Sequence, residues 1–238
     1  MQVSTKAIVL SKIRYQDHDL IVKCYTRDFG IKSYLLKNIL KSKKGNLKPA
    51  YFQLFSLLEI EADHRENRSL QYIRDVKVGY KTETIHTQII KSSIVIFLAE
   101  ITSNILKEEE QNFELYDFIA TAIQWFEAHE TNRSFHFQFL IELTKYLGFY
   151  PELKQDAPYF NLLEGKFQGT NTDMYCISGE NLIFLKTLLG IKFDDNIKLN
   201  LNTNQKRDFL DMILTYFKLH LDGFKEPKSL VVLNQVFN

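Results

Sequence analysis

Five lysines lie within thirteen residues near the amino terminus, in a segment that Gly45 and Pro49 mark as a loop. They are Lys37, Lys41, Lys43, Lys44 and Lys48, and no acidic residue lies between them. Ammonium groups on flexible side chains suit a phosphate backbone whose position varies. A loop whose charges serve solubility alone is the alternative, and the lack of interleaved acids favours phosphate binding.

Three further cations, Lys12, Arg14 and Lys32, lie on or beside short β-rich runs, and we expect them to extend the same positive field. Tyrosines of the same region offer ring faces to bases: Tyr15, Tyr34 and Tyr51. Each tyrosine taken singly fits a core or rim position better, because aromatic rings mostly contribute buried area. We therefore expect the cations to carry binding before the tyrosines.

The charges of the chain are segregated. The first fifty residues carry 11 Lys and Arg against 3 acids, whereas the other 188 carry 19 against 26, and the formal net charge of +1 hides this difference. A basic module of this kind is typical of a protein that meets a polyanion.

Residues that suggest other chemistry are isolated. Asp17, His18 and Asp19 have no second cluster at metal-ligand spacing, so a polar turn is expected there. Cys24 and Cys176 fit two thiols in a reducing compartment better than a disulfide. A Gly-rich phosphate loop and a Gly-x-Ser-x-Gly elbow are both missing. We expect no enzyme, no cofactor and no metal.

Residues 1–80 predict a small barrel. Five β-rich runs cover 7–10, 20–25, 31–36, 55–60 and 70–73, and Gly30 ends a hairpin turn. Five short strands in about 75 residues remove their exposed edges best by closing on themselves. The expected fold is an α+β chain that begins with a five-stranded OB-like barrel.

Residues 81–238 predict an all-α domain, because the apolar period becomes about 3.6. Helices are expected over 84–106, 113–129, 134–147, 178–190 and 204–221, with Ser178 and Thr203 as N-caps. An irregular insertion is expected at about 152–177, and the tail 228–237 is apolar enough to dock. Phenylalanines crowd two of these helices, mostly as core, and a minority could line a groove for an apolar peptide end: Phe113, Phe118, Phe126, Phe135, Phe137 and Phe139.

Targeting signals are not visible in the sequence. No apolar run approaches the roughly 20 residues of a spanning helix, and residues 1–6 lack the pattern of a secretory signal. We expect a cytoplasmic protein with no membrane partner.

A set of short motifs resembles the RecO family of bacterial recombination mediators over essentially the full length. The amino-terminal motifs are Lys6-Ala7-Ile8-Val9-Leu10, Tyr15-x-Asp17-x-Asp19-Leu20, Tyr25-Thr26-x-x-x-Gly30, the lysine segment and Phe52-Gln53-Leu54-Phe55. The later ones are Tyr146-Leu147-Gly148-Phe149-x-Pro151, Tyr216-Phe217-x-x-His220-Leu221-x-Gly223-Phe224 and Lys228-Ser229-Leu230-x-Val232-Leu233. No single motif decides the assignment, but their order and separations fit together.

The resemblance implies an OB fold, a helical body and a nucleoid-associated protein that binds single- and double-stranded DNA without sequence preference. It further implies strand annealing, association with RecR, and help in loading RecA onto DNA coated by single-strand-binding protein. The acidic, phenylalanine-ended tail of that last protein would occupy the helical groove.

Two departures from the family pattern matter. The family's loop commonly carries Lys-Gly-x-Arg where this chain has 37–40, although Asn38 can still adopt a left-handed conformation. Many relatives also hold a four-cysteine zinc module, of which only Cys176 remains here, so no zinc is expected.

The competing hypothesis is a protein-interaction adaptor whose barrel contacts an acidic protein and whose helices form a docking face. Such an adaptor would bind mixed-sequence oligonucleotides poorly even at low salt. A metal-dependent nuclease is a distant third hypothesis, and product formation with magnesium or manganese would test it.

Overall fold

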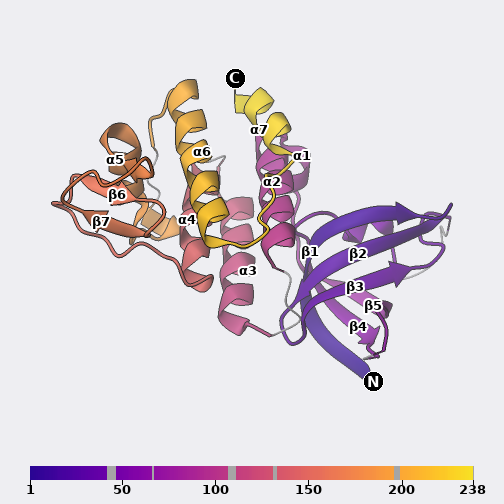
Figure 1. Cartoon of the computed structure of the whole chain (residues 1–238). Helices are drawn as coiled ribbons and strands as arrows, with labels where there is room; N and C mark the ends of the chain where they lie inside the picture. Colours follow the sequence, from indigo (N-terminus) through magenta and orange to yellow (C-terminus); the bar gives the residue numbers. More distant parts are fainter. Residues whose placement is uncertain (42–46, 66, 107–110, 131–132, 196–198, 238) are drawn as a thin grey trace. The chain divides into compact units, whose positions relative to one another are not determined.

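The computed structural model describes residues 1–41, 47–65, 67–106, 111–130, 133–195 and 199–237. The chain divides into two compact units, the amino-terminal unit Met1–Glu130 and the carboxy-terminal unit Thr131–Asn238 (Figure 1). Each unit is described by itself below.

Five strands of the amino-terminal unit close into a barrel in the order β1-β2-β3-β5-β4. Their bounds are β1 Gln2–Tyr15, β2 Asp19–Thr26, β3 Gly30–Leu36, β4 Leu57–Asp63 and β5 Leu70–Tyr80. The pairing of β3 with β5 is parallel and every other pairing is antiparallel, including the one between β1 and β4 that completes the ring. The OB-like barrel predicted from the sequence is confirmed.

Strand alternation builds the barrel core. Ala7 and Val9 of β1, Val22 and Cys24 of β2, and Tyr34 of β3 are all fully buried in one cluster. Burial raises the pKa of the Cys24 thiol to about 12, so this cysteine is an inert core residue.

Two residues with positive φ mark the starts of strands, one as predicted and one not. Gly30 has the positive φ of 61° expected for the hairpin turn. Phe55 also has a positive φ, 62°, so β4 begins at Leu57 rather than at the predicted residue 55. The backbone N–H of Phe55 donates to Val9 O at 2.7 Å, a contact between distant segments that local patterning does not reveal.

The helix predicted over 84–106 is two helices, α1 (Thr84–Thr87) and α2 (Ile89–Ile105). Gln88 between them is extended, with a ψ of 124°. The carboxylate of Glu127 accepts the backbone N–H groups of Thr84 and Ile85 at 2.9 and 3.0 Å and so caps α1. Glu127 belongs to α3 (Phe113–Ala128). The prediction of one continuous helix was wrong at Gln88, whose backbone N–H donates to Thr84 O at 3.0 Å to end α1 while its carbonyl accepts from Ser92 N at 2.8 Å to begin α2.

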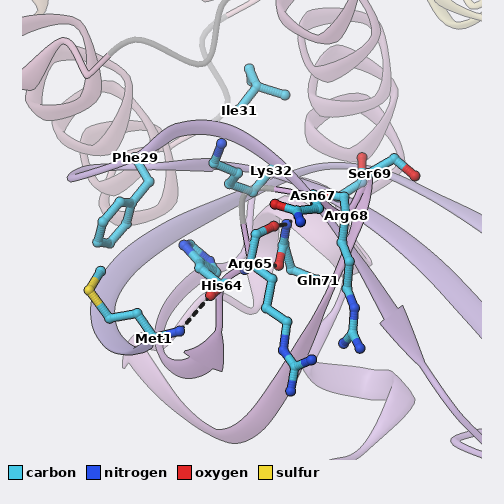
Figure 2. A pocket seen from close by; sticks show the side chains of 11 residues that line it. Met1, Phe29, Ile31, Lys32, His64, Arg65, Asn67, Arg68, Ser69 and Gln71 are labelled. Atoms are coloured by element: carbon cyan, nitrogen blue, oxygen red, sulfur yellow. Dashed lines mark hydrogen bonds between the residues drawn. The ribbon is translucent and has the colours of Figure 1, made fainter.

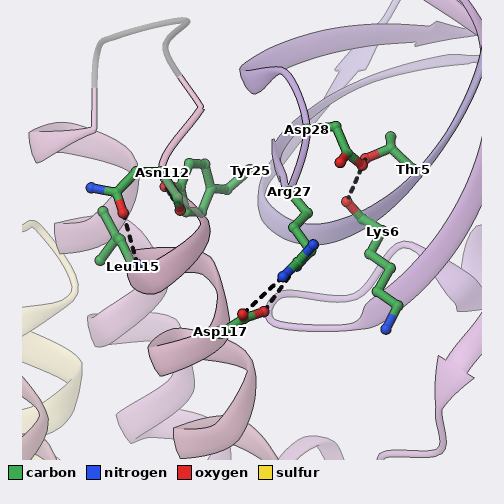
Figure 3. A network of polar contacts seen from close by, with 8 residues as sticks. All are labelled: Thr5, Lys6, Tyr25, Arg27, Asp28, Asn112, Leu115 and Asp117. Carbon is green, nitrogen blue, oxygen red and sulfur yellow. Dashed lines mark hydrogen bonds and ion pairs between the residues drawn. The ribbon is translucent and has the colours of Figure 1, made fainter.

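Polar side chains of β2 attach the barrel to the helices of the same unit. The Lys23 ammonium donates to Ser103 O at 2.5 Å, and the Tyr25 hydroxyl donates to Asn112 O at 3.1 Å. The Arg27 guanidinium makes two bonds of 3.0 Å to the Asp117 carboxylate (Figure 3). Lys23 and Arg27, two cations of the basic amino-terminal region, therefore hold the fold together.

The carboxy-terminal unit contains α4 (Phe135–Tyr146), α5 (Gly179–Leu188), α6 (Thr203–His220) and α7 (Leu230–Phe237).

Four of the predicted stripe's phenylalanines are buried. They are Phe126 of α3, in the amino-terminal unit, and Phe135, Phe137 and Phe139 of α4, in the carboxy-terminal unit. These four belong to the core, as most of the aromatic stripe was predicted to, and cannot line a peptide groove. No helix of the described residues is long and apolar enough to cross a membrane.

The segment predicted to be an irregular insertion contains a small sheet of order β7-β6-β8. Its strands are β6 Tyr159–Asn161, β7 Lys166–Gln168 and β8 Cys176–Ile177. Asn161 holds the connecting turns, because its amide donates to Asp173 Oδ2 at 2.7 Å and its oxygen accepts from Leu163 N at 2.9 Å. Strands of two or three residues are too short to show a period of two, which is why the sequence predicted irregular structure here.

Candidate nucleic-acid interface

The predicted cations of the amino-terminal unit are mostly exposed. Lys32 is half-buried, whereas the others that the structure describes are exposed: Lys12, Arg14, Lys37, Lys41 and Lys48. None of these five exposed cations forms an ion pair with a carboxylate of the described residues. Lys43 and Lys44 lie outside the described residues. The field of the described cations is therefore available to a polyanion.

The turn after β3 is tied to the β1–β2 turn. Asp19 Oδ1 accepts the backbone N–H of Asn38 at 2.7 Å, and His18 O accepts the N–H of Leu40 at 3.0 Å. Asn38 adopts the left-handed conformation expected of it, with a φ of 54°. The acidic motif at 17–19 is thus a polar turn, as predicted, and it positions the beginning of the lysine segment.

Lys12 and Arg14 lie two residues apart on β1 and share a face, but they lie near different segments. Arg14 pairs with Leu20, which in turn pairs with Leu36, so Arg14 and Lys37 lie at neighbouring strand ends. Lys12 lies near α1 instead, where its charge helps to lower the pKa of His86 below the ordinary histidine value, after the larger effect of burial. Arg14 therefore lies at the end of β1 closer to the lysine segment, and Lys12 lies two residues farther back on the same face.

One end of the barrel is hollowed by a cavity of about 660 Å³, here called the barrel-end pocket. Its walls come from Met1, from β3 and the turn before it, and from residues 64, 65 and 67–69 of the β4–β5 loop with the start of β5 (Figure 2). Lys32 reaches it because residues two apart on a strand share a face, and Lys32 continues the inward row of Tyr34 and Leu36. The volume falls within the range of about 300 to 1,000 Å³ usual for ligand sites.

Aromatic rings form one side of the barrel-end pocket. The rings of Phe29 and His64 meet edge to face with centroids 4.8 Å apart, and His64 Nε2 lies 2.9 Å from the Tyr34 hydroxyl. Burial first, and then the charge of Lys32, lowers the pKa of His64 below its ordinary value. The imidazole is accordingly neutral at pH 7 and presents a ring rather than a cation.

Two arginines that the sequence reading missed form the opposite side. Arg65 and Arg68 are exposed on the β4–β5 loop, their side chains extend in the same direction in Figure 2, and neither pairs with a described carboxylate. Glu66, which lies outside the described residues, interrupts the basic run in the sequence, so this loop lacks the acid-free pattern of the lysine segment. The available signal was positional, because the loop between strands four and five of an OB barrel is one of its binding loops.

Tyr72 links the barrel-end pocket to the lysine segment. Lys37 Nζ and the Arg68 guanidinium lie 5.4 and 5.5 Å from the centroid of its ring, within cation–π range. Tyr34, by contrast, is completely buried in the barrel core, which confirms the core position that the sequence favoured over stacking for this tyrosine. Tyr51 is half-buried against the same core, and Tyr15 remains 42% exposed.

The described part of the chain contains no group of three His, Cys, Asp or Glu residues placed to hold a metal ion. Cys176 lies within hydrogen-bonding distance of Gln168 Nε2 and Thr172 N, at 3.0 and 3.4 Å. The exposed cations and aromatic rings of the barrel support, above all, electrostatic binding of an anion beside aromatic faces.

Two family models and several curated proteins are similar to this chain. A family model described as Recombination protein O N terminal matches residues 1–80, and one described as Recombination protein O C terminal matches residues 86–230. Curated proteins named DNA repair protein RecO are similar over 100% of both chains, with 43% identity in Christiangramia forsetii, 42% in Flavobacterium psychrophilum and 31% in Bacteroides fragilis.

Proposed function

The chain belongs to the RecO family of DNA repair proteins, and from that membership we propose that it is a non-catalytic mediator that binds DNA through its barrel and anneals complementary strands. The observation that carries the proposal is the row of exposed cations from Arg14 through Lys37 and Lys41 to Arg68, on the face and loops that OB barrels use for oligonucleotides. Family membership supports a role in DNA repair, and strand annealing is the specific activity that we propose within it.

Annealing requires no bond-making step. Two complementary strands repel each other through their phosphates, and a segment rich in lysine lowers that repulsion while base pairing supplies specificity. The protein acts as a countercharge that brings the strands together. Binding to single and double strands alike follows, because the lysines contact phosphates and carry no sequence information.

Three partner proposals rest on the family resemblance alone. We propose that the protein associates with RecR, binds the tail of single-strand-binding protein and helps to load RecA, all in the cytoplasm at the nucleoid. Annealing of strands precoated with single-strand-binding protein, with and without its tail, tests the tail proposal. Annealing that is independent of the tail would reject it.

The DNA-binding proposal is tested by replacing Lys41, Lys43 and Lys44 together with alanine. Affinity for mixed-sequence oligonucleotides should fall equally for all sequences. The slope of log K against log salt should flatten by up to about 0.7 per lost phosphate contact on single strands. Fluorescence anisotropy over a salt series measures both quantities, and the annealing rate of the same variant should fall with them.

A matched control removes three exposed lysines of the carboxy-terminal unit, Lys154, Lys166 and Lys225. This variant has the same net charge and should keep the wild-type slope. An unchanged slope in the lysine-segment variant rejects the assigned site. Failure of the wild type to bind oligonucleotides at low salt favours the adaptor hypothesis instead.

A further inference from the structure

We infer that the barrel-end pocket holds one unpaired nucleotide of single-stranded DNA, with its base against Phe29 and its phosphates on Arg65 and Arg68. The inference rests on the proposed DNA-binding function and adds to it a preference that the lysine segment cannot supply. Phosphate contacts alone treat single and double strands alike. A concave site with a ring in its wall does not.

The composition of the pocket matches the two parts of a nucleotide. Figure 2 shows Phe29 and His64 near each other at one end, while Arg65 and Arg68 extend from the loop on the other side. Guanidinium groups bind phosphate through paired N–H donors, and bases stack on aromatic rings whatever their sequence. The backbone of Arg65 is held in place, since its N–H donates to Gln71 Oε1 at 2.8 Å and its carbonyl accepts from Gln71 Nε2 at 3.0 Å.

The shape of the pocket excludes a base that is still paired. A base inside a duplex is stacked on both faces, so it can enter a cavity only by being extruded from the stack, which is energetically unfavourable. A single strand has no such requirement. Arg68 and Lys37 both lie over the ring of Tyr72, so the strand leaving the pocket at Arg68 would next meet Lys37 and the lysine segment.

The experiment compares three probes on the full chain: a thymine 15-mer, an abasic strand of the same length and a duplex of that length. The abasic strand keeps every phosphate and offers no base. Wild type should bind the thymine strand about 5- to 150-fold more tightly than the abasic strand, the effect of stacking one base. Equal binding of the two strands would overturn the pocket but leave the proposed function standing.

Two variants locate the effect. Phe29→Leu keeps an apolar side chain against the barrel core and removes the ring, so it should lose most of the preference for base over abasic sites. Arg65→Ala with Arg68→Ala should weaken single-strand binding more than duplex binding. Lys154→Ala with Lys166→Ala removes the same charge from the other unit and should change neither.

A thermal melt of each variant ensures that the comparison is made on folded protein. Retention of the full base preference by folded Phe29→Leu contradicts the assignment. Equal loss of single-strand and duplex binding in the arginine variant reduces the pocket to part of a general charged surface and also contradicts it. Wild-type protein that binds none of the three probes refutes the proposed function itself.

Discussion

At the scale of single residues, several cationic side chains stabilise the fold through hydrogen bonds inside the protein. Lys91 is almost fully buried, yet its ammonium donates to Thr84 Oγ1 and to the carbonyls of Glu127 and His129, at 2.9, 3.2 and 2.7 Å. Lys23 and Arg27 likewise bind other parts of the amino-terminal unit. A count of cations therefore overstates the charge offered to DNA, and only the pairing of each group shows which ones remain.

The burial of His136 in α4 predicts how the free energy of unfolding changes as the pH falls. It is buried, and desolvation, with a smaller contribution from the charge of Lys206, lowers its pKa to about 3. The unfolded chain protonates this ring below about pH 6.5 whereas the folded chain does not, so its burial destabilises the fold as pH falls. His136→Gln should remove a loss of about 2 kcal/mol in unfolding free energy between pH 7 and pH 5.

Urea unfolding of both proteins at the two pH values measures the difference. His18→Gln, at an exposed turn position, is the control and should follow the wild type. If the wild type and the His136→Gln variant lose the same stability between pH 7 and pH 5, the folded protein protonates His136 and the inference about its burial is wrong.

At the scale of elements, the N-cap of α6 lies one residue before the position that the sequence predicted. Thr203 was predicted to cap the helix that follows, but the N-cap of α6 is Asn202. Asn202 Oδ1 accepts from Gln205 N at 3.0 Å while Gln205 Oε1 accepts from Asn202 N at 2.9 Å, which forms a capping box. The prediction chose the wrong residue because asparagine and threonine are adjacent and both favour caps.

This cap can be tested by two neighbouring alanine variants. Asn202→Ala should lower the free energy of unfolding by about 1 kcal/mol, because the side-chain oxygen that accepts the backbone N–H of Gln205 is lost. Thr203→Ala, at an equally exposed site one residue later, should change it by less than about 0.5 kcal/mol. Chemical denaturation measures both, and equal effects would show that the box contributes little.

At the scale of the whole molecule, the amino-terminal compact unit extends well beyond the β-rich region. The strands end at Tyr80 and the family model of the amino-terminal part ends at residue 80, yet the amino-terminal unit extends to Glu130. Ile8 and Leu10 of β1 explain the difference. They alternate with the barrel-core residues Ala7 and Val9 and are still fully buried, on the strand that packs against α2.

The stability of fragments follows from this arrangement. A fragment of residues 1–130 should unfold cooperatively, because it keeps the contacts of Lys23, Tyr25 and Arg27 with the helices. A fragment of residues 1–80 loses these contacts and exposes Ile8 and Leu10, so it should melt at a lower temperature or aggregate. Circular dichroism melts and light scattering make the comparison, and equal midpoints would show that the barrel is stable without α1 to α3.

The sequence by itself determined the barrel, the helical remainder, the polar turn at 17–19 and the lysine segment, because each depends on alternation, turn chemistry or charge along a short stretch. Tertiary structure decided the break at Gln88, the sheet around β6 and the pairing of Arg27. It also assembled the barrel-end pocket from Phe29, the β4–β5 loop and Gln71. Those features depend on which distant residues meet, and closure of a barrel brings together side chains whose separation along the chain carries no local pattern.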